Sequence, residues 1–123
     1  MKTILVVDAN FKDLLRLKEI LHKVVNEIGI QAEILAANSG AEALGLIETE
    51  GIDMLITEFS MPDVGGLDLI RALPDRFEIV KILVASNRIE IEARVMIAEE
   101  GIQAVLKKPI DENELRSILQ RFL

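Results

Sequence analysis

One short pattern occurs three times in this chain and strongly limits the folds open to it. An acidic stretch, a Gly-Ile pair and an apolar run follow one another in NEIGIQAEIL (26–35), ETEGIDMLI (48–56) and AEEGIQAVL (98–106). Glycine just past a helix end adopts a left-handed backbone that other residues adopt only at a cost. A short apolar run suits a strand buried on both faces. We therefore expect Gly29, Gly51 and Gly101 each to end a helix with a left-handed turn before a buried strand.

Start signals for helices precede several stretches in which apolar residues recur every three or four positions. Asn10 can cap the first of these. Ser39 with Glu42, and Asp111 with Glu114, have the spacing of a capping box. The sequence predicts strands over 3–8, 31–36, 52–57, 79–85 and 103–107, and helices over 10–28, 39–49, 66–73, 88–100 and 111–122.

The segment 88–100 is the ambiguous one. RIEIEARV alternates with a period of two and can be read as a strand. We favour a helix because EEG resembles a helix end and because parallel strands need a crossover at this point. Five β-α units predict an α/β protein, with one parallel sheet covered by helices on both faces. In such proteins ligands bind beyond the carboxyl ends of the strands.

Polar residues end four of the five predicted strands. Asp8 follows TILVV, Glu58 follows MLIT, Ser86 follows KILVA, and Lys108 follows AVLK. In a parallel sheet these ends share one edge. Two acids, a hydroxyl and an ammonium would together form an environment suited to a divalent metal and a phosphate. Each residue alone has an ordinary structural explanation, but the four together favour a site.

Composition excludes several classes of function. The net charge is −7, no Lys/Arg cluster is present, and Tyr and Trp are absent, which argues against nucleic-acid binding. Cysteine is absent, so disulfides and thiolate metal sites are excluded. The apolar run before Asp8 is too short for a signal peptide or a membrane span. We expect a cytoplasmic protein without membrane association.

Four segments resemble the response-regulator receiver domain over essentially the whole chain. They are ILVVD (4–8), LITEFSMPDVGG (55–66), ILVAS (82–86) and LKKP (106–109). The resemblance implies a single receiver domain over residues 1–123. It also implies a flavodoxin-like (βα)5 three-layer sandwich with strand order 2-1-3-4-5. In this family, an aspartate ending the third strand accepts a phosphoryl group from a histidine kinase in the presence of Mg²⁺.

The resemblance also assigns roles by position. Glu58 occupies the phosphoacceptor position, and Asp8 matches one of the acids that hold the metal. Ser60 matches the residue whose backbone carbonyl binds metal, Ser86 the switch hydroxyl, and Lys108 the lysine that contacts phosphate. It further implies a cis peptide bond before Pro109.

Three departures from the family pattern bear on function. Glu58 replaces the acceptor aspartate, Ala9 stands where a second acid is usual, and Val105 replaces a frequent aromatic residue. A glutamate carries its carboxylate one methylene further, away from the in-line position that phosphoryl transfer needs. There it can pair with Lys108 or accept a hydrogen bond from Ser86.

These departures predict an atypical receiver that is not an enzyme and is not phosphorylated on aspartate. It would act in two-component signalling as a protein-interaction module, with no required cofactor and only weak Mg²⁺ binding. One alternative is a conventional phosphoacceptor with weakened Mg²⁺-dependent phosphorylation. Another is a small flavodoxin-like cofactor binder, which the lack of a Ser/Thr-rich phosphate loop and of Trp or Tyr disfavours.

Partners are expected to be a histidine kinase or another signalling protein. Receivers commonly use the face formed here by 88–100, 103–107 and 111–122, and a homodimer can form through it. Not every apolar residue of 88–100 can face the sheet, so an exposed patch and a fully buried helix are both open. The residues of this candidate output face are Ile89, Ile91, Val95, Met96 and Val105.

Overall fold

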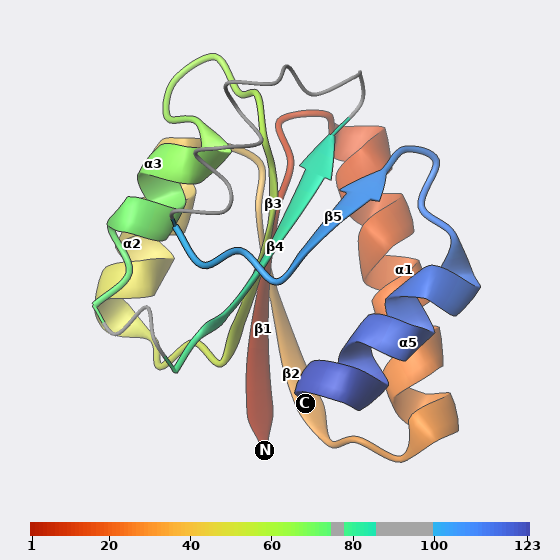
Figure 1. The fold of residues 1–123 in the computed structure, drawn as a ribbon. Helices are drawn as coiled ribbons and strands as arrows, with labels where there is room; N and C mark the ends of the chain where they lie inside the picture. Colours follow the sequence, from red (N-terminus) through yellow and green to blue (C-terminus); the bar gives the residue numbers. More distant parts are fainter. Residues whose placement is uncertain (75–77, 86–99) are drawn as a thin grey trace.

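Five parallel strands form one sheet in the order β2-β1-β3-β4-β5, which confirms the predicted α/β fold and its strand order (Figure 1). The computed structural model describes residues 1–74, 78–85 and 100–123. The helix expected over 88–100 falls almost wholly outside these ranges. The strands are β1 (Lys2–Val7), β2 (Ala32–Ala37), β3 (Met54–Glu58), β4 (Val80–Ala85) and β5 (Ala104–Lys107), and the helices are α1 (Phe11–Ile28), α2 (Gly40–Thr49), α3 (Gly66–Arg71) and α5 (Glu112–Phe122).

Helices cover both faces of the sheet, and each face has its own apolar core. Figure 1 shows α1 and α5 on one face and α2 and α3 on the other. Strand residues alternate between the two cores, as the period of two requires. Ile4, Met54 and Ile82 pack with α1 and α5, whereas Leu5, Leu55 and Leu83 pack with α2 and α3. The three central strands are therefore buried on both faces.

Helix starts follow the capping residues that the sequence indicates. The Asn10 side chain accepts from Asp13 N–H, and Ser39 accepts from Glu42 N–H. The Asp111 carboxylate accepts from the N–H groups of residues 113 and 114. Each cap of this kind contributes about 1 kcal/mol to stability. Within the described ranges, no helix combines the length and the apolar character needed to cross a membrane.

Two of the three glycines of the repeated pattern have the predicted left-handed backbone, and one does not. Gly29 has φ 78° and Gly101 has φ 71°, both in the left-handed region. Gly51 has no positive φ, so that prediction is wrong. Helix α2 instead ends at Thr49, and its cap residue Glu50 has an extended backbone and donates its N–H to the Leu46 carbonyl. The chain leaves this helix directly into an extended segment and needs no left-handed residue.

The loop between β3 and α3 is fastened to the start of α2. The Asp63 carboxylate accepts from Gly40 N–H at 3.1 Å and from Ala41 N–H at 2.9 Å. These are two of the N–H groups that a helix start leaves without partners. They hold the pKa of Asp63 below its usual range, together with the N–H of Val64. These hydrogen bonds therefore link the loop that follows Glu58 to the start of α2, although Gly40 and Asp63 are 23 residues apart in the sequence.

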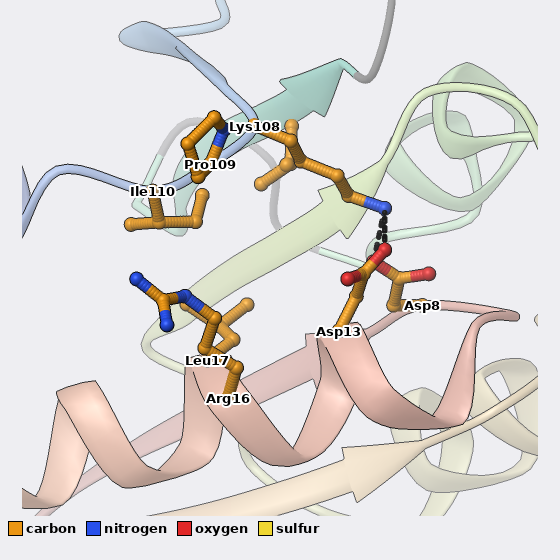
Figure 2. Close-up of a pocket in the computed structure, with 8 residues that line it drawn as sticks. Asp8, Asp13, Arg16, Leu17, Lys108, Pro109 and Ile110 are labelled. Atoms are coloured by element: carbon orange, nitrogen blue, oxygen red, sulfur yellow. Dashed lines mark hydrogen bonds and ion pairs between the residues drawn. The ribbon is translucent and has the colours of Figure 1, made fainter.

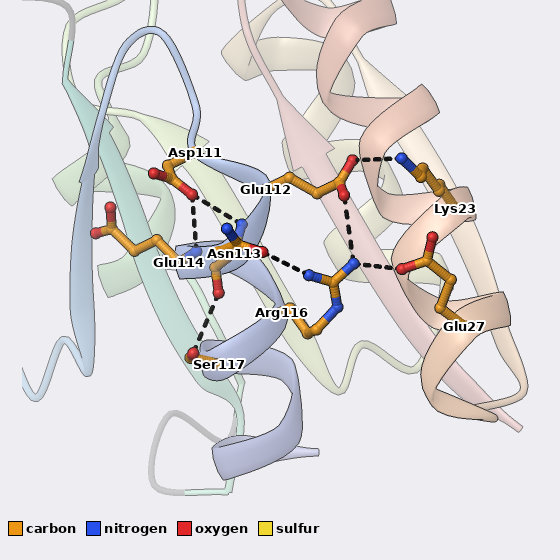
Figure 3. A network of polar contacts seen from close by, with 8 residues as sticks. All are labelled: Lys23, Glu27, Asp111, Glu112, Asn113, Glu114, Arg116 and Ser117. Atoms are coloured by element: carbon orange, nitrogen blue, oxygen red, sulfur yellow. Dashed lines mark hydrogen bonds and ion pairs between the residues drawn. The ribbon is translucent and has the colours of Figure 1, made fainter.

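Charged side chains join α5 to α1 along their exposed sides. Lys23 pairs with Glu112 at 3.0 Å, and the Arg116 guanidinium contacts both Glu112 and Glu27 (Figure 3). Exposed pairs contribute little singly, about 0–1 kcal/mol each. Their shared members nevertheless fix the angle between the two helices above the common apolar core.

Replacing Gly40 with alanine should test the fastening of the β3–α3 loop. A Cβ at Gly40 would lie 2.4 Å from Val64 Cβ and 2.7 Å from the Val64 carbonyl oxygen, so loop or helix must move. We expect Gly40→Ala to lower the free energy of unfolding by about 1–3 kcal/mol, measured by urea denaturation.

Gly45→Ala is the matched control on the same helix. Nothing lies within 4 Å of a Cβ at Gly45, and alanine is the better helix former. This variant should raise the free energy of unfolding by about 0.5–1 kcal/mol. Equal effects of the two substitutions would contradict the close contact at Gly40.

Candidate functional site

A single lysine side chain binds three carboxylates at the carboxyl edge of the sheet. Lys108 Nζ lies 2.7 Å from Asp8 Oδ2, 2.8 Å from Asp13 Oδ2 and 3.0 Å from Glu58 Oε2. Figure 2 shows Lys108 reaching towards Asp8 and Asp13 from the turn after β5. The ammonium therefore ties together the ends of β1, β3 and β5 and the first turn of α1.

The strand register brings these residues together. Val7 pairs with Thr57, so Asp8 follows β1 beside the end of β3, where Glu58 lies. Lys107 pairs with Ala85 across β4 and β5, and Lys108 N–H donates to the Ala85 carbonyl. Neighbouring strands lie about 4.8 Å apart, so the lysine needs its long side chain to reach β3 and β1 across β4.

Both strand-end acids are removed from water. The side chains of Asp8 and Glu58 are 5% and 6% exposed, and that of Lys108 is 18% exposed. Asp8 Oδ1 also accepts from Asn10 N–H at 2.8 Å. Buried charges need partners of this kind, because an unpaired one would be costly. The third acid, Asp13, is 39% exposed and lies at the rim of the site.

Burial and charge shift the pKa values of Glu58 and Lys108 in the same direction for different reasons. Burial raises the pKa of Glu58, and the Asp8 and Asp13 carboxylates add to this, while Lys108 opposes it. Burial alone would lower the pKa of Lys108, but its contacts with Asp13, Asp8 and Glu58 raise it above the ordinary value. Three acids share one cation, so the lysine is firmly charged while Glu58 holds its proton more tightly than usual.

Glu58 fits its surroundings imperfectly. Among the residues that the structure describes, its Oε2 is the buried side-chain oxygen or nitrogen without a hydrogen-bond partner. Its contact with Lys108 Nζ is close enough for an ion pair but lacks hydrogen-bond alignment. The backbone around it is tightly packed, since a Cβ at Gly66 would lie 2.4 Å from the Glu58 carbonyl oxygen. The main chain is thus fixed here, and the side chain must accommodate the extra methylene.

Other residues assigned by sequence lie around this centre in different settings. Ser60 is exposed in the β3–α3 loop, and Ala9 is exposed beside Asp8. Val105 is half-buried in β5 and packs against the core on the α2 and α3 face. The Lys108–Pro109 bond is cis. Five residues lie outside the described ranges, namely Ser86, Ile89, Ile91, Val95 and Met96.

The strand-end acids already contact protein donors at the place where the resemblance assigns a divalent metal. In the part of the chain that the structure describes, no group of three His, Cys, Asp or Glu side chains is arranged to hold a metal ion. Mg²⁺ requires near-octahedral oxygen ligands. The Lys108 ammonium contacts Asp8 Oδ2 and Glu58 Oε2, and the backbone N–H of Asn10 holds Asp8 Oδ1. A metal would compete with these donors for the same oxygens, without an acid at Ala9 to help.

Residues 4–120 match the response regulator receiver domain family. The chain belongs to this family. It is therefore a receiver domain of two-component signalling, a signalling module rather than a classical enzyme. The family implies partners from two-component systems, such as histidine kinases.

Individual relatives agree with this assignment. The chain is 23% identical over 120 residues to the chemotaxis protein CheY of Pseudomonas aeruginosa, covering 96% of this chain and 93% of that protein. It is 32% identical over 92 residues to the transcriptional regulatory protein CpxR of Escherichia coli, covering 72% of this chain but only 39% of that protein.

A solved receiver domain has the same fold. The receiver of the sensor histidine kinase PA1611 from Pseudomonas aeruginosa superposes with a TM-score of 0.79 at 22% identity, covering 98% of this chain and 96% of that one. That structure has a magnesium ion coordinated in its active-site cleft. At this identity the likeness establishes the fold alone.

Sequence analysis did not identify Asp13 and Asp63, which both contact site elements. Asp13 lies in the first turn of α1, where an acid is explained by the helix dipole alone. The available signal was its spacing of five residues from Asp8. A helix that begins directly after a strand places its first turn close to the end of that strand. Asp63 contacts α2 across 23 residues of sequence, and no local pattern indicates such a pairing.

Glu58→Gln should reveal the raised pKa of the buried acid. A carboxyl whose folded pKa is raised contributes stability that is fully present below the unfolded pKa and is lost as the pH rises through the folded pKa. The free energy of unfolding of the wild type, minus that of Glu58→Gln, should therefore fall as the pH rises from about 4 towards neutrality. Urea denaturation at a series of pH values, with a chelator present, measures this difference.

Glu42→Gln provides the matched control, because Glu42 is an exposed acid on α2. The difference in free energy of unfolding between the wild type and Glu42→Gln should not show the pH dependence expected for Glu58→Gln. A Glu58 difference that rises with pH would mean that the attraction of Lys108 outweighs burial.

Proposed function

We propose that this receiver is atypical: its Glu58 does not accept a phosphoryl group, and the domain acts as a protein-interaction module. The observation that carries the proposal is the ion pair at 3.0 Å between Glu58 Oε2 and Lys108 Nζ. Phosphoryl transfer depends on positioning the attacking oxygen in line with the leaving group. The acid at this position instead lies against the lysine that, in the family, contacts phosphate.

The charge distribution supports the same proposal. Asp8, Asp13 and Glu58 already place three carboxylates around Lys108. An incoming phosphoryl group would bring further negative charge and would have to take the ammonium from these acids. The lysine of the pocket is thus already paired with the protein's own carboxylates. This arrangement suits a domain that keeps one conformation without phosphorylation.

Weak Mg²⁺ binding follows from the donor set. Asp8, Glu58 and the Ser60 carbonyl are the ligands that the resemblance assigns, and the two carboxylates contact Lys108. If bound, the metal would supply positive charge for an incoming phosphoryl group. Ala9 provides no ligand, and no cofactor is required for an interaction module.

We propose that the domain comprises residues 1–123 and that its partner is a histidine kinase or another signalling protein. The output face proposed from the sequence includes Val105 on β5 and the neighbouring α5, which also offers a route to a homodimer. An exposed apolar feature lies on α1, where the side chains of Phe11 and Leu15 are one turn apart and 61% and 43% exposed.

Incubation with acetyl phosphate and Mg²⁺ should leave the wild-type chain unmodified. Intact mass spectrometry would detect one added phosphoryl group, and peptide mapping would assign it. A stable phosphoryl adduct on Glu58 would refute the proposal and support the conventional phosphoacceptor. The measurement needs no knowledge of the natural kinase.

The double variant Glu58→Asp with Ala9→Asp should acquire phosphorylation under the same conditions. The shorter acid withdraws from Lys108 towards the in-line position, and the second acid supplies a metal ligand. The two single variants are the matched controls and should be modified less than the double variant. An inert double variant would mean that Glu58 and Ala9 are not the cause of the defect.

A further inference from the structure

A cavity of about 270 Å³ lies beside the Lys108 cluster, between α1, the end of β4 and the turn after β5. Its wall is apolar, formed by Leu17, Val84 and Ile110, which are 4%, 2% and 8% exposed. Ligand pockets typically measure about 300–1,000 Å³, so this one suits a compact molecule. Its lining also includes the charged groups Asp8, Asp13, Arg16 and Lys108.

Opposite charges occupy different parts of this cavity. Figure 2 shows Asp13 and Arg16 rising from the same helix, with the carboxylate turned towards Lys108 and the guanidinium turned towards Pro109 and Ile110. The two residues are three positions apart, so their Cβ atoms lie about 5–6 Å apart. The diverging side chains separate the charges further.

The Asp13 carboxylate and the Arg16 guanidinium each have polar atoms that can still bind a ligand. Asp13 contacts Lys108 through Oδ2, and no contact of its Oδ1 is found within the described ranges. The Arg16 guanidinium likewise has no ion pair or hydrogen bond there. Three carboxylates share the one Lys108 ammonium, which leaves an excess of negative charge at that end. The Arg16 end carries a positive charge that no described residue pairs with.

We infer that this cavity binds a small zwitterion with an ammonium group at one end, a carboxylate at the other and an aliphatic chain between them. The ammonium would pair with Asp13, the carboxylate would form a bidentate contact with Arg16, and the chain would lie on Leu17, Val84 and Ile110. Arginine suits the second role because its planar group matches a carboxylate. The site adds a ligand-binding capacity to the proposed function and does not depend on whether Glu58 is phosphorylated.

Because the ligand would contact Asp13, it would also act on the Lys108 cluster. An ammonium at Asp13 Oδ1 would add positive charge to the carboxylate that Lys108 contacts through Oδ2. The ligand would thereby weaken the attraction between Asp13 and Lys108, while Asp8 and Glu58 keep their contacts with the lysine. A soluble metabolite of this class would in this way act on the carboxyl edge of the sheet.

Titration of the full chain with 5-aminopentanoate tests the inference, followed by the backbone amide chemical shifts in NMR spectra. We expect saturable shifts at Arg16, Leu17, Lys108 and Ile110, with a dissociation constant on the order of 1 mM. L-Norvaline is an isomer whose ammonium and carboxylate are attached to the same carbon, and pentanoate lacks the ammonium. Each should bind about tenfold more weakly.

Arg16→Gln should weaken binding of 5-aminopentanoate about tenfold, whereas Lys12→Gln, which removes another exposed cation of α1, should not change it. Arg16 is exposed, so its variant should fold, and the ligand comparison on the wild-type chain needs no variant at all. Equal binding of norvaline or pentanoate, unchanged binding by Arg16→Gln, or no saturable shift would each overturn the inference. The proposed function is tested with acetyl phosphate, whereas these binding experiments do not use it. The two proposals can therefore fail independently of each other.

Discussion

The ammonium of Lys108 is the interaction on which the carboxyl edge of this sheet depends. One cation reaches from the end of β5 to carboxylates at the ends of β1 and β3 and on α1. Without it, Asp8 and Glu58 would be two buried like charges on neighbouring strands, which is costly. With it, three segments far apart in the sequence share one electrostatic partner. The same interaction raises the pKa of the lysine and moderates the effect of burial on Glu58.

Asp13 compensates for the acid that is missing at Ala9 in the number of carboxylates around Lys108. The strand-end dipeptide Asp8-Ala9 has lost one acid relative to the family pattern, and this loss suggests a less negative site. The first turn of α1 returns a carboxylate to Lys108 at 2.8 Å, so the ammonium still has three acidic partners. That acid comes from α1, whereas Asp8 and Glu58 come from the strand ends. Three carboxylates therefore surround Lys108 although position 9 is an alanine.

The sequence predicted the elements of the fold well because each carries its own local signal. Capping side chains at Asn10, Ser39 and Asp111 mark helix starts, and apolar runs mark buried strands. The strand order followed from resemblance to the receiver family, since local patterns do not specify which strands are neighbours. Gly51 was misjudged because a helix can also end in extended backbone. The contacts of Asp13 and Asp63 depend on helix rotation and on loop placement, which are tertiary properties.

The glutamate at position 58 is best understood through the parts of the site that cannot move. Gly66 lies against the Glu58 carbonyl, and the β3–α3 loop is held by Asp63 at the start of α2, so the backbone has no room to retreat. The extra methylene must therefore extend the carboxylate towards the lysine. Its Oε2 reaches ion-pair distance but not hydrogen-bond alignment, which leaves a buried oxygen incompletely satisfied. Lys108 Nζ, 3.0 Å away, is therefore the charged partner of this buried oxygen, and the closely packed backbone leaves the carboxylate beside it.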